Sequence, residues 1–297
     1  MAAEPVVVGV DGSEESLRAV EWAAREARRH SAPLRIVSAP ALVPRMHSPS
    51  TPPGEIACAL RGIAARALDA AITRAEEVAP GLPLTTELLS GPPALAVADS
   101  GAGASMLVVG ARGAGGFAAM VLGSVSRYVA SHAPGPVVVV RQESMAVHRE
   151  IAVGIRDPQD TGAPLAFAFD EAALRQADLV AVHTWSPSAP DRPAGKDLDR
   201  ISAEAAGDLA AALQEWSEKY PDVRVRQDVI HGHPARVLAS YSARADLVVL
   251  GRHGHPGGVG PGIGSVQHAV LDHAHGPVAI IPSGDCTGPV PRKDNPR

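Results

Sequence analysis

The sequence predicts an α/β protein of two tandem, doubly wound domains, each with a five-stranded parallel sheet. The chain has 297 residues, about twice the length of one typical domain. Its second half repeats the first, since the sequence pattern of residues 7–10 recurs at 152–155 and that of 91–94 recurs at 232–235. Within each half, short runs of Val, Ile and Leu alternate with longer Ala-rich segments of helical periodicity. This alternation is typical of a parallel sheet covered by helices.

The offset between the two copies supports the division into domains. Gly9 matches Gly154, which is 145 positions later, and Gly91 matches Gly232, which is 141 positions later. We therefore expect a first domain at residues 1–145, a second at 146–284 and a flexible tail, rich in Gly, Pro and charge, at 285–297.

Hydrophobic periodicity places the elements of the first domain in order. Ser13 can cap the first helix, and Glu14 and Glu15 suit the positive pole of its first turn. The proline-rich stretch 40–54 is expected to be a loop. The strands are nearly continuous in Val, Ile and Leu, so we expect all of them to be buried on both faces. The expected strands are 5–10, 34–39, 84–89, 106–110 and 137–141, and the expected helices are 14–30, 55–79, 94–100 and 124–133.

The second domain is expected to repeat this order, with helices between its strands. In doubly wound sheets the ligand crevice lies at the carboxyl ends of the strands, where the connections leave in opposite directions. We expect Asp11, Ser38 and Gly110 to lie at that edge of the first sheet. The expected strands of the second domain lie near Ile151, Val180, Val225, Val248 and Val278.

Each half carries a glycine loop after its fourth strand. The pattern is Gly-x-x-Gly, nine residues and then Gly-Ser, and it occurs at 110–124 and again at 251–265. Glycines let the backbone approach closely, so successive N–H groups can hold phosphate oxygens, and the helix that follows adds its own free N–H groups and positive pole. Neither loop contains a lysine, so this is not a P-loop. Arg112 can add a positive charge to the predicted phosphate site, and Ser126 can add a second hydroxyl beside that of Ser124. The alternative is that the glycines only turn the chain between strand and helix.

With these motifs the chain resembles a tandem universal stress protein. The resemblance covers residues 6–282 and rests on both glycine loops, on Val-Gly-Val-Asp-Gly-Ser at 8–13 and on Gly-Pro-Val-Val-Val-Val at 135–140. It implies a Rossmann-like fold of the adenine nucleotide alpha hydrolase type and pairing of the domains through their last strands. It also implies ATP, with or without Mg²⁺, in the crevice.

The resemblance also implies a set of nucleotide-binding residues. Asp11 is expected to face the ribose and adenine, Val37 to contact the adenine, and the glycine loop with Ser124 to hold ribose and phosphates. The full expected set is Val10, Asp11, Gly12, Ser13, Val37, Gly110, Arg112, Gly113, Gly123, Ser124 and Val125 in the first domain, and Gly251, Gly254, Gly264 and Ser265 in the second.

The two crevices differ at the end of the first strand. Arg156 stands at the position of Asp11, and Asp157 and Pro158 follow it where the first copy has Gly-Ser. A guanidinium donates hydrogen bonds but accepts none, so the adenosine end of the second crevice is in doubt, whereas its phosphate end is kept. Asp157 can replace Asp11 only within the backbone restriction that Pro158 imposes. For Asp11 itself, the alternative is an Asx turn that begins a helix.

Two other kinds of site have weaker support. Three His-x-His pairs lie after residue 230, but they fall in different elements, and no cluster of Cys, Asp or Glu completes a zinc site. Ser124 and Ser265 follow glycines, yet no Gly-x-Ser-x-Gly nucleophile motif is present. Single tryptophans are expected to pack, although Trp185 could stack on a base at the second crevice. The histidine pairs are His231 and His233, His253 and His255, and His273 and His275, and the other tryptophans are Trp22 and Trp216.

Composition excludes several classes of protein. The net charge is −5 and no run is strongly basic, which argues against a nucleic-acid partner. No uninterrupted apolar stretch is long enough to span a membrane, and no secretory signal pattern is present. Cys58 and Cys286 lie far apart, so neither a disulfide framework nor a cysteine metal pair is expected. These features predict a cytoplasmic protein.

The expected function is therefore that of a cytoplasmic universal stress protein that binds ATP in at least the first domain. No general base or metal–carboxylate pair accompanies the loop, so we expect a non-catalytic sensor or regulator without catalytic or metal-binding residues. A homodimer and a regulatory protein partner are compatible with this function. Two alternatives stay open, namely an interaction scaffold with vestigial crevices and a slow ATPase.

Overall fold

The computed structural model describes residues 3–40, 53–113, 122–141, 147–158, 162–185, 195–252 and 262–282. Four expectations fall on residues outside these ranges. They concern most of the loop 40–54, the glycine-loop residue Gly254, the pair His253 and His255, and the tail 285–297.

In the described part of the first domain, strands and helices alternate along the chain as predicted. Every element begins and ends within two residues of its predicted bounds. The elements are β1 (Val6–Val10), α1 (Glu14–Arg29), β2 (Leu34–Ser38), α2 (Pro53–Val78), β3 (Leu84–Leu88), α3 (Pro93–Asp99), β4 (Met106–Gly110), α4 (Ser124–His132) and β5 (Val137–Val140).

The second domain repeats the same order, and each predicted strand position lies within a strand. The elements are β6 (Glu150–Ile155), α5 (Gly162–Arg175), β7 (Asp178–Trp185), α6 (Gly195–Lys219), β8 (Val225–His231), α7 (Pro234–Tyr241), β9 (Leu247–Arg252), α8 (Ser265–His273) and β10 (Val278–Pro282).

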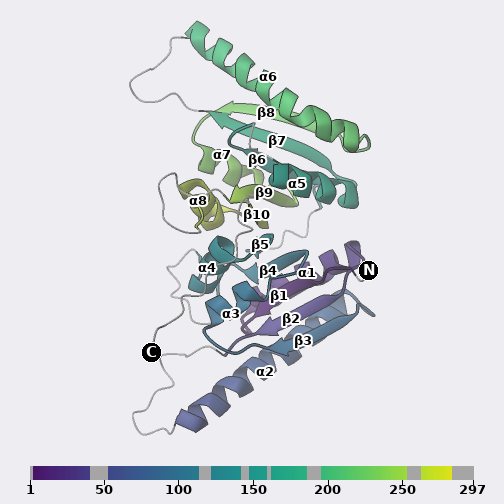
Figure 1. Cartoon of the computed structure of the whole chain (residues 1–297), viewed down its shortest axis with the longest axis vertical. Helices are drawn as coiled ribbons and strands as arrows, with labels where there is room; N and C mark the ends of the chain where they lie inside the picture. The colour runs from purple at the N-terminus through teal and green to yellow at the C-terminus, as the bar shows by residue number, and fades with distance from the viewer. Residues whose placement is uncertain are drawn as a thin grey trace, which may run out of the picture.

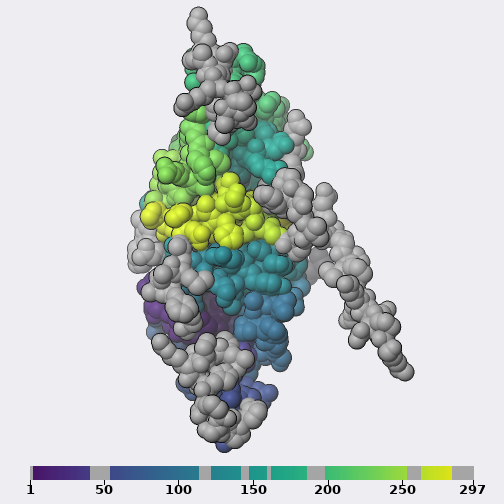
Figure 2. Space-filling model, turned by 90° about the vertical axis from the view of Figure 1, so that its left-hand side faces the viewer, coloured from purple at the N-terminus to yellow at the C-terminus, as the bar shows by residue number. Residues whose placement is uncertain are grey.

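The strands of both domains form one ten-stranded sheet in the order β3-β2-β1-β4-β5-β10-β9-β6-β7-β8. Neighbours within each domain are parallel, whereas β5 and β10 pair antiparallel with Val138 opposite Ala279. This seam joins the two domains, and α2 and α6 lie at opposite ends of the molecule (Figure 1). Figure 2 shows the last described segment, in yellow, as a band against the first domain. The two doubly wound α/β domains and their pairing through the last strands are confirmed.

Helices cover both faces of this sheet. Alternate strand residues point to opposite faces, so Val6 and Val8 pack with α1 and α2 whereas Val7 packs with α3 and α4. In the second domain, α5 and α6 cover the same face as α1, and α7 and α8 cover the other. The expectation that all strands are buried on both faces is wrong for β3 and β8, which are the edge strands and contain no buried residue. No helix in the described ranges is both long and apolar enough to cross a membrane.

Four ionisable side chains from α1 and α5 meet across the domain boundary. Glu26 lies on α1 and His30 is the C-cap of that helix, and their counterparts 145 positions later, Glu171 and Arg175, lie on α5. Arg175 Nη2 lies 2.9 Å from Glu26 Oε2, in an ion pair that lacks hydrogen-bond alignment, and His30 Nε2 lies 2.8 Å from Glu171 Oε1. Each basic side chain therefore reaches the equivalent glutamate of the other domain, as in a two-fold interface. Both glutamates are at most 2% exposed, so their pairing is needed to keep them charged.

This cluster has the spacing of a metal site but not the charge. Ligand atoms of Glu26, His30 and Glu171 lie within 4.8 Å of one another, the one such set in the part of the chain that the structure describes. Arg175 contacts both glutamates, and Arg29 also pairs with Glu26. A metal ion would have to enter beside two guanidinium groups, so we assign the cluster to ion pairing between the domains.

The two domains also exchange arginine contacts at the seam. Arg141, which follows β5, donates from Nη2 to the carbonyl of Leu271 on α8 at 3.2 Å. Arg252, at the end of β9, donates from Nη1 to the carbonyl of Ala133 at the end of α4 at 2.6 Å. Each arginine thus satisfies a carbonyl at the negative pole of a helix of the other domain.

The pKa values of the α1–α5 cluster shift in directions that favour the ion pairs. The hydrogen bond with Glu171 raises the pKa of His30, and this effect outweighs that of burial. Burial opposes ionisation of Glu171, but its hydrogen bond with His30 and the charge of Arg175 leave its pKa lowered. Between the ordinary values of 4.5 and 6.5, both partners are therefore charged.

Replacing His30 with Gln removes this charge while keeping a polar side chain. Because the folded-state pKa of His30 lies above 6.5, the stability it contributes is complete below pH 6.5 and is lost as the pH rises through the raised pKa. We expect the difference in free energy of unfolding between wild type and H30Q to be larger between pH 4.5 and 6.5 than at higher pH. Urea unfolding of both proteins across this range measures the difference. A difference that is constant or that grows at high pH would contradict the assignment.

Candidate functional site

The position predicted for the first crevice is where β1 and β4 end beside each other. The chain leaves β1 towards β2 on one side and leaves β4 towards β5 on the other, so this is the point where the connections diverge. Val10 ends β1 and Gly110 ends β4, as predicted. Ser38, at the end of β2, donates its hydroxyl to the carbonyl of Val10 at 2.8 Å and so joins the two strand ends.

Asp11 connects the end of β1 with both α1 and the glycine loop. Its Oδ1 accepts hydrogen bonds from the Ser13 amide at 3.0 Å and from the Ser13 hydroxyl at 2.6 Å, which is an Asx turn. Ser13 in turn caps α1 by accepting from the amide of Ser16 at 3.2 Å. The other oxygen of Asp11, Oδ2, lies so close to Gly113 that a Cβ on that glycine would overlap it. The Asx-turn alternative is therefore real for one oxygen, while the other oxygen faces the glycine loop.

Glycine is required at three positions of this site for different structural reasons. Gly12 has φ of +83°, a backbone conformation that favours glycine. A Cβ on Gly110 would lie 2.9 Å from the backbone of Glu15, so α1 begins directly over the end of β4. Gly110 thus serves close packing, whereas Gly113 lies next to the Asp11 carboxylate.

The first turn of α4 offers backbone donors to the crevice. Gly123 is its N-cap, and the Gly123 amide donates to the carbonyl of Ala111 at 2.8 Å, which closes the base of the loop. Among the described residues, no side chain forms a capping hydrogen bond at the start of this helix. Ser124 begins it with an exposed side chain, and Val125 packs against the hydrophobic cluster beneath α3 and α4. An uncapped helix start carries free N–H groups and a positive pole, which is suited to an anion.

Ser126 has a structural role that its sequence position did not reveal. Its hydroxyl donates to the carbonyl of Gly110 at 2.6 Å instead of facing the crevice. In the second domain, Gln267 lies 141 positions later and donates to the carbonyl of Gly251 at 2.7 Å. Both domains therefore fasten the end of their fourth strand with a side chain from the helix that follows.

Two arginines and one glutamate lie near the predicted crevice. Arg112 follows β4, Arg141 follows β5, and Glu15 lies in the first turn of α1. Arg112 Nε donates to Glu15 Oε1 at 2.8 Å, and this hydrogen bond raises the pKa of Arg112. Burial, followed by repulsion from Arg112, lowers the pKa of Arg141, which shows that the two guanidinium groups are near each other. Two cationic side chains thus lie near the crevice, but Arg112 is already paired with Glu15, and Arg141 also feels the charge of Asp272. Sequence reasoning missed this pair because its members are 97 residues apart.

Two hydrophobic residues of the predicted site, Val10 and Val37, are buried in the structure, and Val125 is partly buried. Val37 is 0% exposed and belongs to the cluster that also contains Val97 of α3. Val10 is 5% exposed. Contact between Val37 and an adenine ring stays a prediction.

The second crevice repeats the framework with other side chains. Arg156 follows β6 with an exposed side chain. His183 Nδ1 lies 3.0 Å from the carbonyl of Ile155 and so takes the place of Ser38. Trp185 lies at the end of β7 with its ring 4.8 Å from that of His231, and its buried indole N–H has no acceptor within the described ranges. Trp22 and Trp216 pack in or against the core as expected.

Three of the four residues predicted to bind phosphate in the second domain lie in the part of the chain that the structure describes. Gly251 lies within β9, Gly264 is the N-cap of α8 without a side-chain cap, and Ser265 begins α8 with an exposed side chain. The predicted partner Gly254 lies outside the described residues.

Comparison with known proteins places these features in one family. The model of the universal stress protein family matches residues 3–141 and again 148–282. A universal stress protein of Mycolicibacterium smegmatis is 35% identical over 288 residues, and one of Mycobacterium tuberculosis is 37% identical over 283 residues. Each alignment covers 93% of this chain and 96% of the relative. The crystal structure of a universal stress protein from Archaeoglobus fulgidus has a TM-score of 0.67 at 18% identity, covers 96% of this chain and 98% of its own, and shares the fold.

Replacing Gly110 with Ala tests the close approach of α1 to β4. The added Cβ meets the backbone of Glu15, so we expect a loss of about 1 to 3 kcal/mol in the free energy of unfolding. Gly207 of α6 is the matched control because a Cβ on it would have no neighbour within 4 Å, and Gly207→Ala should stabilise the protein by about 0.5 to 1 kcal/mol. Denaturant unfolding measures both. Equal effects of the two substitutions would argue against the packing at Gly110.

Proposed function

Because the chain belongs to the universal stress protein family and has two such domains in tandem, we propose that its first domain binds an adenine nucleotide, with ATP as the expected ligand. The site is the crevice between β1 and β4. The observation that carries this proposal is the contact between the Asp11 carboxylate and Gly113 at the point where the connections diverge. In this proposal the protein senses or regulates a stress response in the cytoplasm.

The residues of the first crevice fit the parts of a nucleotide. Asp11 carries a carboxylate that the Asx turn holds in place, and carboxylate oxygens can accept hydrogen bonds from ribose hydroxyls. The uncapped first turn of α4 offers N–H groups and a positive pole to phosphates. Arg112 and Arg141 add positive charge nearby. The absence of a side chain at Gly113 leaves room for Asp11, and a Cβ there would displace it.

The same residues argue for binding without efficient catalysis. Phosphoryl transfer needs a positioned base or water-orienting group and oxygen ligands for the metal ion. Among the described residues of the crevice, Asp11 is engaged with Ser13 and Glu15 is engaged with Arg112. A slow ATPase is the enzymatic alternative, and it would release ADP steadily under turnover conditions.

The second domain supports a different role. Arg156 stands where the first domain has its acceptor, so we propose that the second crevice does not take adenosine in the same way. A scaffold that presents this domain to a regulatory protein is the second candidate function, and a homodimer is compatible with either. The proposed domain boundaries, 1–145 and 146–284, enclose the two ranges that match the family.

Removing the Asp11 carboxylate tests nucleotide binding in the first domain. We expect D11A to weaken ATP binding by about ten- to a hundredfold, because it removes a charge-assisted hydrogen bond. Asp69→Ala on the exposed side of α2 is the matched control and should bind as the wild type does. Titration calorimetry measures affinity, and ATP-dependent thermal stabilisation gives a second readout. The proposal is wrong if wild type does not bind ATP at millimolar concentration or if D11A binds it equally well.

Replacing Arg156 with Asp tests whether one change of charge disabled the second crevice. Arg156→Asp restores an acceptor at the end of β6, so we expect the number of ATP molecules bound per chain to rise from one towards two. Titration calorimetry with and without the Asp11→Ala substitution assigns the added site to the second domain. Unchanged stoichiometry would show that more than Arg156 separates the two crevices.

A further inference from the structure

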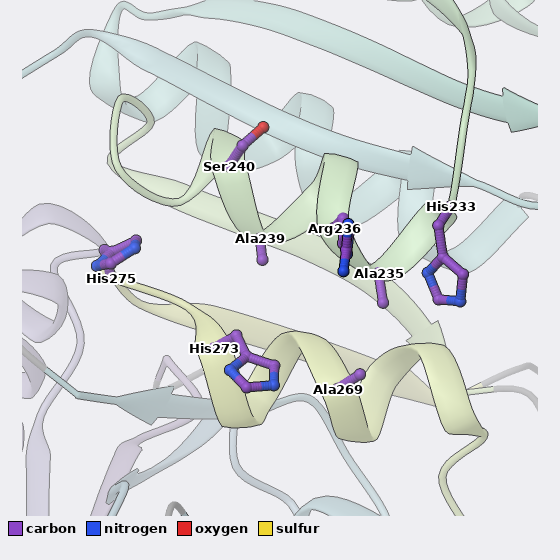
Figure 3. Close-up of a pocket in the computed structure, with 8 residues that line it drawn as sticks. All are labelled: His233, Ala235, Arg236, Ala239, Ser240, Ala269, His273 and His275. Carbon is purple, nitrogen blue, oxygen red and sulfur yellow. The ribbon is translucent and has the colours of Figure 1, made fainter.

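A groove of about 840 Å³ lies between α7 and α8 of the second domain. Its middle is lined by the small apolar side chains of Ala235, Ala239 and Ala269, and polar side chains, all but one of which carry nitrogen, surround them (Figure 3). None of the lining residues is acidic, and none belongs to the crevice described above. The surrounding residues are His233, Arg236, Ser240, His273 and His275.

The first domain fills the corresponding place with an aromatic ring. Tyr128 of α4 lies 141 positions before Ala269, and its ring stacks on His132 with centroids 4.0 Å apart. His132 is the counterpart of His273, so the histidine is common to both domains. The change from Tyr to Ala therefore removes the ring that covers this histidine and leaves space between α7 and α8.

At the positions that line the groove, the remaining differences between the two copies all add a nitrogen donor or remove a carboxylate. Residues without a side-chain nitrogen are replaced by nitrogen donors, and a carboxylate is replaced by a hydroxyl. These pairs are Pro92 and His233, Leu95 and Arg236, Pro134 and His275, and Asp99 and Ser240. Asp272 precedes His273 on α8, but it does not line the groove, and its charge acts on Arg141 instead. Opening of the groove and gain of donors thus occur together.

The size and chemistry of the groove indicate one class of ligand. Small-molecule pockets commonly have volumes of about 300 to 1,000 Å³ and combine apolar walls with a few polar groups. Arg236 presents a planar fork that suits a carboxylate or phosphate, and the imidazoles can donate beside it. A metal ion is a poor fit because the groove histidines are absent from the one metal-like set in the described ranges.

We propose that this groove binds a small organic anion. Its carboxylate or phosphate group contacts Arg236 and a neighbouring histidine, and its apolar body covers the three alanines. This site is separate from the nucleotide crevice and does not depend on the function proposed for the first domain.

The test uses two probes, phenyl phosphate and phenylacetate, added to the full chain labelled at its alanine methyl groups. We expect saturable chemical-shift changes at Ala235, Ala239 and Ala269, with millimolar or tighter affinity for at least one probe. Phenyl phosphate alone would indicate a phosphate ligand, and phenylacetate alone would indicate a carboxylate. Because the signals are local, binding in either nucleotide crevice is distinguished from binding here.

Two substitutions in the groove test which of its residues bind the probes, and two substitutions elsewhere serve as controls. Arg236→Gln should weaken probe binding by about tenfold or more, since a charged hydrogen bond is lost. Ala269→Tyr places in the groove the residue that the first domain tolerates at this position, so it should fold and abolish the shifts. Arg200→Gln, at an exposed position of α6, controls for the loss of one positive charge, and this variant should bind the probes as the wild type does. Tyr128→Ala opens the equivalent place in the first domain without the arginine and should not create a site at Ala94 and Ala98.

Three results would overturn the proposal. The first is the absence of shifts at the three groove alanines with both probes. The second is equal binding by wild type and Arg236→Gln. The third is equally strong binding of benzyl alcohol, which would show an apolar groove without selection for an anion.

Discussion

The backbone of α1 crosses the end of β4 because residue 110 has no side chain. A Cβ at Gly110 would meet the Glu15 backbone at 2.9 Å, so this approach sets where α1 begins. The start of α1 in turn positions Ser13, and Ser13 holds one oxygen of Asp11. The other oxygen is left beside Gly113. The geometry of the crevice therefore depends on a contact between two backbones, and the chemically active groups are arranged around it.

The two copies share a framework while their surfaces have diverged. The strand ends are fastened by equivalent side chains in both domains, and the buried α1–α5 ion pairs follow the same pseudo-two-fold relation. The differences lie where a ligand could touch the protein, at Arg156 and along the groove beside α8. A duplicated domain can change its ligand in this way because packing constrains the core and leaves exposed positions free.

The sequence was sufficient for the elements, their order, and the meeting of Asp11 with the glycine loop, because these follow from periodicity, glycine spacing and the rule for doubly wound sheets. The sequence was not sufficient to predict contacts that depend on how the two domains pack against each other. Glu26 and Glu171 are equivalent in the repeat, but only the packing of α1 against α5 shows that Arg175 and His30 pair with them. The exposure of β3 also needed the strand order, because a strand at the edge of a sheet lacks a neighbour on one side.

The central claim is that the first crevice holds an adenine nucleotide against Asp11 and the start of α4. A crystal structure of the full chain grown with excess ATP and Mg²⁺ tests it most directly. The account predicts density for the ribose beside Asp11 and for phosphates at the first turn of α4. Density that shows this crevice filled by protein side chains, with no nucleotide in it, would contradict the account.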